Sequence, residues 1–169
     1  AFVASLIAAG WTRFPFRVLA DQEPLMRDRL APFRAEIEAA AERAPDPVGV
    51  GILLWRAMHH HIGLLRRDHP DWIFVRHEDL SLDPVGGFGE LYARLGLDFS
   101  ERTAAGIAGY SEAGAGRAGL SIFGVRRRIV RNSRDTISYF RKRLTPAQIA
   151  RIEDASRDVW PDFYAAADR

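Results

Sequence analysis

The chain has 169 residues, of which 47% are hydrophobic and 27% charged, and it contains no cysteine. This composition is typical of a globular protein and excludes disorder and collagen-like structure. The lack of cysteine excludes disulfides, thiol catalysis and thiolate metal sites. The formal net charge is only +2, yet residues 117–143 hold eight Arg and one Lys beside a single acidic residue, Asp135. Such a cationic region favours an anionic partner.

The first half of the chain has the hydrophobic spacing of helices. The sequence opens at Ala1 in an apolar helical stretch with no N-cap residue before it. We therefore expect a piece of a longer protein that is cut inside a helix. Pro15 interrupts this stretch. Apolar residues at helical spacing then predict helices over about 23–43 and 48–67, separated by a proline-containing break.

Residues 72–75 (Trp-Ile-Phe-Val) are the clearest strand candidate, because the run is short, apolar, β-branched and aromatic. A strand of this kind is buried on both faces and needs a neighbour at each edge. No other segment of the chain is a good partner, so we expect the rest of the sheet in sequence missing from this chain. The alternative is that the run is a helix or a core loop.

The second half contains several helix-start signals, each a capping side chain before a helix and two of them followed by proline. They predict helices over about 84–95, 100–110 and 146–157, the first of them ended by Gly96. Between the last two helices we expect a glycine-rich loop and then the basic run 126–134. The capping side chains are Asp83, Ser100 and Thr145.

Four stretches, in their order and spacing, resemble sulfotransferases that use 3′-phosphoadenosine 5′-phosphosulfate (PAPS). The run 72–84 resembles the family's buried strand, its Arg/Tyr-x-Glu-Asp-Leu motif and the Asp-Pro helix start. The run 88–97 resembles the next helix and its end, and the run 140–145 resembles a C-terminal stretch of the family. The opening run 2–6 is similar to the helix after the family's Arg-Asp/His-Pro motif.

The resemblance implies an α/β P-loop fold with a central parallel sheet, of which this chain would be the C-terminal part, mostly helical with one strand at 72–76. Residues 1–169 would form a single partial domain. The phosphate loop and the catalytic base would lie upstream, so this chain would contain no catalytic residue and would be inactive alone.

The resemblance also implies residues that bind the cofactor. Ser5 corresponds to a serine that binds the 3′-phosphate. Arg131, Ser133 and Arg134 lie where the family holds that phosphate a second time, although the family's Arg-Lys-Gly is not present and Phe140 replaces a Trp. The other two candidates are His77 and Ser111: His77 follows the strand where relatives contact adenine, and Ser111 lies beside Tyr110 near the nucleotide.

Each candidate also has a purely structural interpretation. Ser5 read alone is a small helix residue, His77 is equally well explained as a hydrogen-bonded structural residue, and a helix end explains Ser111. Glu78 and Asp79 are better explained by capping or ion pairs than by acid–base catalysis. The triplet at 59–61 (His-His-His) spreads around a helix rather than sharing one face, so we expect no metal.

The resemblance therefore implies a sulfotransferase that moves a sulfuryl group from PAPS to a hydroxyl or amine. Helices within 23–67 would form part of the acceptor wall, and the acceptor would be a small molecule, a carbohydrate or a lipid. We expect a cytoplasmic protein, since the sequence has no export signal or membrane span. The alternative is a helical binding module whose region 117–143 docks nucleic acid or an acidic partner, although the aromatic pattern of single-strand binders is lacking.

Overall fold

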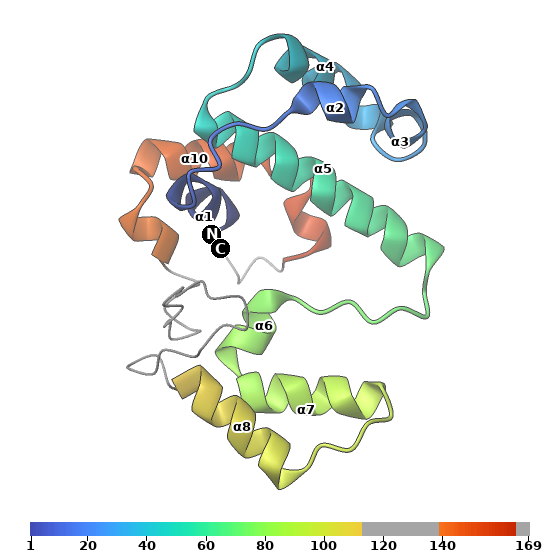
Figure 1. The fold of residues 1–169 in the computed structure, drawn as a ribbon, viewed down its shortest axis with the longest axis vertical. Coiled ribbons are helices and arrows are strands. Elements are labelled where there is room, and N and C mark those ends of the chain that lie inside the picture. Colours follow the sequence, from blue (N-terminus) through green and yellow to red (C-terminus); the bar gives the residue numbers. More distant parts are fainter. Residues whose placement is uncertain (113–138, 165–169) are drawn as a thin grey trace, which may run out of the picture. The chain divides into compact units, whose positions relative to one another are not determined.

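The computed structural model describes residues 1–112 and 139–164, which form α-helices and short 3-10 helices (Figure 1). The chain divides into two compact units. Unit 1 comprises Ala1–Trp72 and Phe140–Arg169, and unit 2 comprises Ile73–Tyr139. No helix among the described residues is both long enough and apolar enough to cross a membrane.

The predicted α/β fold with a parallel sheet is wrong for this chain, because the described residues contain no strand. The strand expected at 72–76 is absent: residues 73–76 belong to no helix or strand. The backbone at Arg76 is extended, with φ −87° and ψ 136°. An extended run becomes a strand only when a neighbour pairs with its backbone, and the described residues supply no second strand. Trp72 and Val75 are about half exposed, so the run is not buried on both faces.

Unit 1 is built around its longest helix, α5 (Pro47–Asp68). The Asp46 side chain caps this helix by accepting a hydrogen bond of 2.7 Å from the backbone N–H of Gly49. Helix α1 (Phe2–Ala8) packs closely on α5, since a Cβ on Gly51 would lie 3.0 Å from the methyl groups of Val3. Helix α10 (Pro146–Ala155) also contacts α5 (Figure 1). The predicted helices at 48–67 and 146–157 are thus confirmed.

The single helix predicted over 23–43 is instead three short ones: α3 (Glu23–Asp28), a 3-10 turn η1 (Ala31–Phe33) and α4 (Arg34–Glu42). Pro32 explains the break, because proline has no backbone N–H and disfavours helical geometry in the residue before it. A further short helix that the sequence did not predict, α2 (Phe16–Ala20), precedes them.

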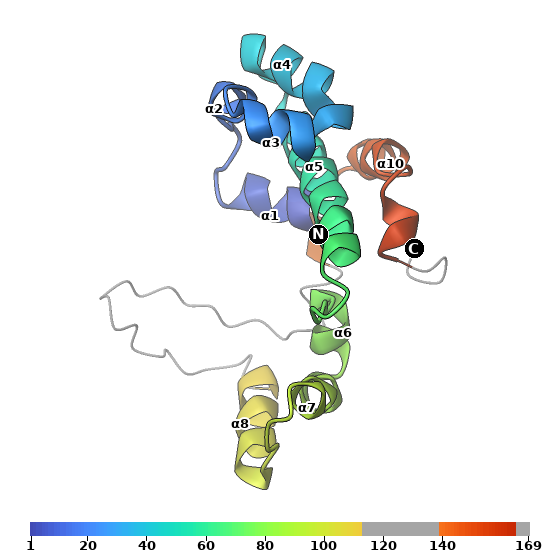
Figure 2. The same ribbon diagram turned by 90° about the vertical axis from the view of Figure 1, so that its right-hand side faces the viewer.

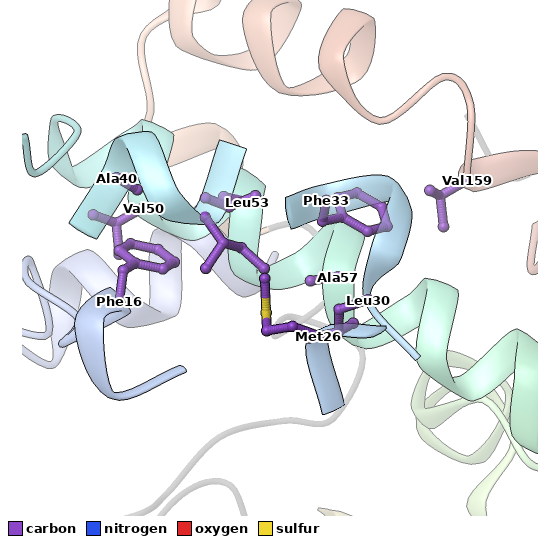
Figure 3. Packing of buried hydrophobic residues seen from close by; sticks show 10 residues of the cluster. Phe16, Met26, Leu30, Phe33, Ala40, Val50, Leu53, Ala57 and Val159 are labelled. Carbon is purple, nitrogen blue, oxygen red and sulfur yellow. The ribbon is translucent and has the colours of Figure 1, made fainter. Parts of the chain in front are cut away.

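The hydrophobic core of unit 1 lies between α5 and the helices α2, α3 and α4. Phe16, Met26, Ile37 and Val50 are its most deeply buried side chains, each at most 1% exposed. Figure 3 shows side chains from these four helices meeting in one cluster, with Val159 of the C-terminal segment at its border. A smaller cluster of Val3, Val48 and Ile52 joins α1 to α5. Burial of these side chains supplies the main stabilisation of the unit.

The C-terminal segment of unit 1 adds aromatic contacts to α5. It contains all of the 3-10 helix η2 (Tyr139–Lys142) except Tyr139, and the 3-10 helix η3 (Trp160–Asp162), which lie on either side of α10 in the chain. The ring of Trp160 stacks on Tyr164 with 4.4 Å between centroids and lies 6.0 Å from the ring of Trp55 on α5. These contacts hold the end of the described chain against the long helix.

Unit 2 contains α6 (His77–Leu82), α7 (Pro84–Arg94) and α8 (Glu101–Glu112), of which α7 and α8 cross each other (Figure 2). The predicted helices at 84–95 and 100–110 are confirmed. Helix α6 was not predicted, because its first residues were read as a motif that follows the carboxyl end of the strand. Among the described residues of unit 2, only Ser81 is buried.

Candidate functional site

Capping side chains fix where α7 and α8 begin. The Asp83 carboxylate accepts a hydrogen bond of 3.1 Å from the backbone N–H of Gly86, as the Asp-Pro pair predicts. A Cβ on Gly86 would lie 2.1 Å from a carboxylate oxygen of Asp83, so a larger residue there would force the capping side chain to shift. The Ser100 hydroxyl likewise accepts a hydrogen bond of 3.2 Å from the N–H of Thr103.

The turn between α7 and α8 brings the two helices together. Gly96 has a positive φ of 67°, which ends α7 in the left-handed conformation that glycine tolerates. Phe99 then packs back on α7: its ring meets Tyr92 edge-on at 5.2 Å, and a Cβ on Gly89 would lie 3.5 Å from the same ring. The short connection and this aromatic contact position the two helices side by side.

A cleft of about 420 Å³ lies between these helices, and we refer to it as the α7–α8 cleft. Phe88 of α7 forms one wall, and all other lining residues belong to α8. Their spacing of three to four residues places them on one face of the helix. The α8 lining residues are Arg102, Thr103, Gly106, Ile107, Tyr110 and Ser111.

The chemistry of the α7–α8 cleft suits a planar ring that carries an anionic group. Phe88 and Tyr110 offer aromatic surfaces, and Tyr110 is 89% exposed. Arg102 makes no ion pair with any residue that the structure describes, so its guanidinium is available to an anion. The hydroxyls of Thr103 and Ser111 add hydrogen-bonding groups. A volume of this size falls within the range of small-molecule sites.

No known protein helps to name this site. The chain matches no protein-family model, no curated protein and no solved structure.

Of the six predicted cofactor-binding residues, Ser111 is the one that lines the cleft. Ser5 lies on α1 in unit 1 and is exposed. Arg131, Ser133 and Arg134 lie outside the described residues, and so does most of the basic region 117–143.

His77 belongs to unit 2 but does not line the α7–α8 cleft. It is the first residue of α6, and its Nε2 lies 3.3 Å from the hydroxyl of Ser81, which is buried. This is the structural interpretation that the sequence left open for His77. One helical turn separates the two residues, which explains why they meet.

Asp79 forms an ion pair with Arg76 at the start of α6, as expected from the sequence. The Arg76 Nε donates to one carboxylate oxygen of Asp79 at 2.8 Å, and Nη2 donates to the other. This guanidinium holds the pKa of Asp79 below its usual range. Asp79 is therefore a charged structural partner, unlike a general acid, which needs a raised pKa.

The triplet at 59–61 occupies a part of α5 where neighbouring rings engage the histidines separately. His59 stacks on Trp55 with 3.9 Å between ring centroids, whereas His60 meets Phe33 edge-on at 5.3 Å. His59 also donates from Nδ1 to the carbonyl of Trp55 at 2.9 Å. Within the described ranges, no group of three His, Asp or Glu side chains is close enough to hold a metal ion.

Sequence reasoning missed most of the cleft lining. The sequence did place Phe88, Thr103 and Ile107 on predicted helices. The spacing of Thr103 and Ile107 also puts them on the same helical face as Tyr110. Nothing in the sequence distinguished Arg102 as a binding residue, because arginine provides 23 of the 24 basic residues and Arg102 belongs to no motif. Only the crossing of two helices identifies which arginine faces an aromatic surface.

Proposed function

We propose that this chain supplies nucleotide-binding contacts to a sulfotransferase that uses PAPS, with the α7–α8 cleft taking the adenine side of the nucleotide. One observation carries the proposal: Ser111, which the family resemblance implies near the nucleotide, lines a cleft that also holds two aromatic rings and an arginine with no ion pair to a described residue. The resemblance and the cleft chemistry are independent arguments for the same kind of ligand.

In this proposal the adenine ring lies against Phe88 and Tyr110, and the Thr103 and Ser111 hydroxyls hydrogen-bond to its polar edge or to the ribose. The Arg102 guanidinium pairs with a phosphate of the nucleotide. A guanidinium of this type suits the phosphate of a nucleotide, because its donors can form two parallel hydrogen bonds with phosphate oxygens.

The proposed reaction transfers a sulfuryl group and needs no oxidant or reductant. The acceptor oxygen or nitrogen forms a bond to the sulfur, and the bond between sulfur and the 5′-phosphate oxygen breaks. The acceptor proton passes to a base, and adenosine 3′,5′-bisphosphate leaves with the electron pair. Such transfers depend mostly on positioning and on stabilisation of the leaving charge, which is the contribution we assign to the cleft.

Isothermal titration calorimetry with adenosine 3′,5′-bisphosphate and with AMP tests the proposal. We expect saturable binding of the bisphosphate and binding of AMP that is at least about tenfold weaker, because AMP lacks the 3′-phosphate. Equal affinity for both nucleotides, or no binding of either, would contradict the proposal. Oligonucleotide binding with a steep salt dependence and no nucleotide binding would favour the alternative of a basic docking region.

Matched pairs of variants test whether the nucleotide binds in the α7–α8 cleft. A Cβ on Gly106 or on Gly109 has open space around it, but only Gly106 lines the cleft. Gly106→Leu fills the cleft and should abolish nucleotide binding, while Gly109→Leu should leave it unchanged. Arg102→Ala should weaken binding about tenfold, whereas Arg94→Ala, an exposed arginine on α7, should not. Equal effects within either pair would contradict the assignment.

A further inference from the structure

A second cleft, of about 690 Å³, lies in unit 1 beside α4 and the first turns of α5, and we refer to it as the α4–α5 cleft. Helix α10 contributes Arg151 and Ala155 to its lining. Most of its lining lies within residues 23–67, which the resemblance assigned to an acceptor wall, and it contains none of the six predicted cofactor-binding residues. Its lining combines three arginines and two carboxylates with mostly small aliphatic side chains.

Two of the three arginines in the lining are already neutralised. Arg56 donates to Glu36 at 2.7 Å and to Asp158 at 2.8 Å, and only 17% of its side chain is exposed. Arg151 donates to Asp46 at 2.6 Å, next to the N-terminus of α5. These pairs belong to the framework of the unit, because each joins elements far apart in the sequence.

Arg43 is different. It lines the cleft from the connection after α4, its side chain is exposed, and it makes no ion pair with any described residue. The lining therefore contains one guanidinium whose charge no carboxylate compensates. Its planar set of donors matches a carboxylate with two parallel hydrogen bonds.

The other lining residues indicate the chemistry of the part of the ligand that does not bind Arg43. Besides the arginines, the lining contains the carboxylates of Glu36 and Asp46, and each of these is held in an ion pair by an arginine. The remaining side chains of the lining are aliphatic, and the described lining contains no aromatic ring. An aliphatic chain would gain burial there, whereas a planar heterocycle would find no stacking partner. The apolar lining residues are Ala39, Ala40, Ala44, Pro45, Ile52, Leu53 and Ala155.

We propose that the α4–α5 cleft binds a medium-chain aliphatic carboxylate, with its chain on the aliphatic wall and its carboxylate on Arg43. The inference does not depend on the proposed sulfotransferase function, because the cleft belongs to the other unit and its ligand class differs from a nucleotide. Binding at the two clefts can therefore be measured separately.

The test uses octanoate and octylammonium, which share a chain and differ in the sign of the head group. Each is titrated into the ¹⁵N-labelled 169-residue chain while amide chemical shifts are recorded. We expect saturable shifts at Ala39, Arg43 and Ile52 with octanoate and none with octylammonium. Equal binding of both compounds, or no saturable shift with octanoate, would overturn the proposal.

Two pairs of variants control the result. Arg43→Ala should weaken octanoate binding about tenfold. Arg17→Ala should not change it, because Arg17 is an exposed arginine on α2 outside the cleft lining. Ala39→Trp should block the cleft, while Ala35→Trp, exposed on the same helix but outside the lining, should not. Circular dichroism confirms that each variant is folded. Octanoate binding that survives both Arg43→Ala and Ala39→Trp in folded protein would refute the site.

Discussion

Arg56 shows how one side chain can join three parts of unit 1. Its guanidinium binds Glu36 of α4 and Asp158 near η3, and it lies 5.1 Å from the ring centroid of Phe33. The aliphatic part of the side chain is covered by these neighbours, so its contribution includes packing as well as charge. Arg56 is therefore stabilising, because its guanidinium makes several weak contacts at once.

We predict that Arg56→Ala lowers the free energy of unfolding by about 1–2 kcal/mol, through lost packing and two lost ion pairs. Urea denaturation followed by circular dichroism measures the change. The control is Arg157→Ala, which removes an ion pair with Asp154 whose side chains are both more than three-quarters exposed. The control should cost less than about 0.5 kcal/mol. Equal losses in the two variants would contradict the anchoring role of Arg56.

The same ion pair predicts a dependence of stability on pH. The hydrogen bond from Arg56 holds the pKa of Asp158 below its usual range. A carboxyl with a lowered folded pKa stabilises the protein above its unfolded pKa of about 3.9, and this contribution is lost as pH falls through the folded value. Unfolding free energy should therefore fall below about pH 4, and the fall should be shallower in Arg56→Ala. Identical acid profiles would contradict this coupling.

At the scale of the element, local capping signals predicted the helix starts well. Thr145 and Gln148 form the expected capping box at α10, with hydrogen bonds of 3.2 and 2.9 Å. These signals succeed because both partners lie within one turn of the chain. The predictions that failed depended on more distant partners or on one overlooked residue: the strand at 72–76 lacks a partner among the described residues, and Pro32 divides the helix predicted over 23–43.

We predict that Thr145→Ala lowers the free energy of unfolding by about 1 kcal/mol, because the N–H of Gln148 loses its acceptor. Thr145→Ser retains the hydroxyl and should lose only a few tenths of a kcal/mol. Chemical denaturation compares the two variants. A serine variant as unstable as the alanine variant would show that the hydroxyl cap is not the stabilising feature of this helix start.

At the scale of the whole molecule, the two units differ in how they are stabilised. Every buried hydrophobic side chain in the described part of the chain belongs to unit 1. In unit 2, Leu82, Leu95 and Leu97 are each more than half exposed. Helices that bury little apolar surface open readily, because tertiary packing supplies most helical stability.

Hydrogen exchange followed by mass spectrometry tests this difference. We predict that amides of α5 exchange much more slowly than those of α7 and α8, since opening α5 disrupts the main core. Adenosine 3′,5′-bisphosphate should then slow exchange in α8 and leave α5 unchanged. Protection of α7 and α8 equal to that of α5 without nucleotide would contradict the stability difference.

The candidate site depends on how two helices pack together, and this is the feature that the sequence predicted least. The family resemblance brought Ser111 forward, but Phe88 and Arg102 join it only because Gly96 and Phe99 turn α8 back across α7. The sequence places Phe88 on a predicted helix, but nothing in the sequence near Phe88 or Arg102 indicates that the two residues lie at one site. A cleft between two helices is a property of their crossing, which spacing along one helix does not define.

We propose that the α7–α8 cleft holds the adenine ring of the nucleotide. Intermolecular nuclear Overhauser effects between bound adenosine 3′,5′-bisphosphate and the chain test it most directly. We predict contacts from adenine H2 and H8 to the ring protons of Phe88 and Tyr110. A bound nucleotide whose adenine protons contact neither ring, or a nucleotide that does not bind, would contradict the account.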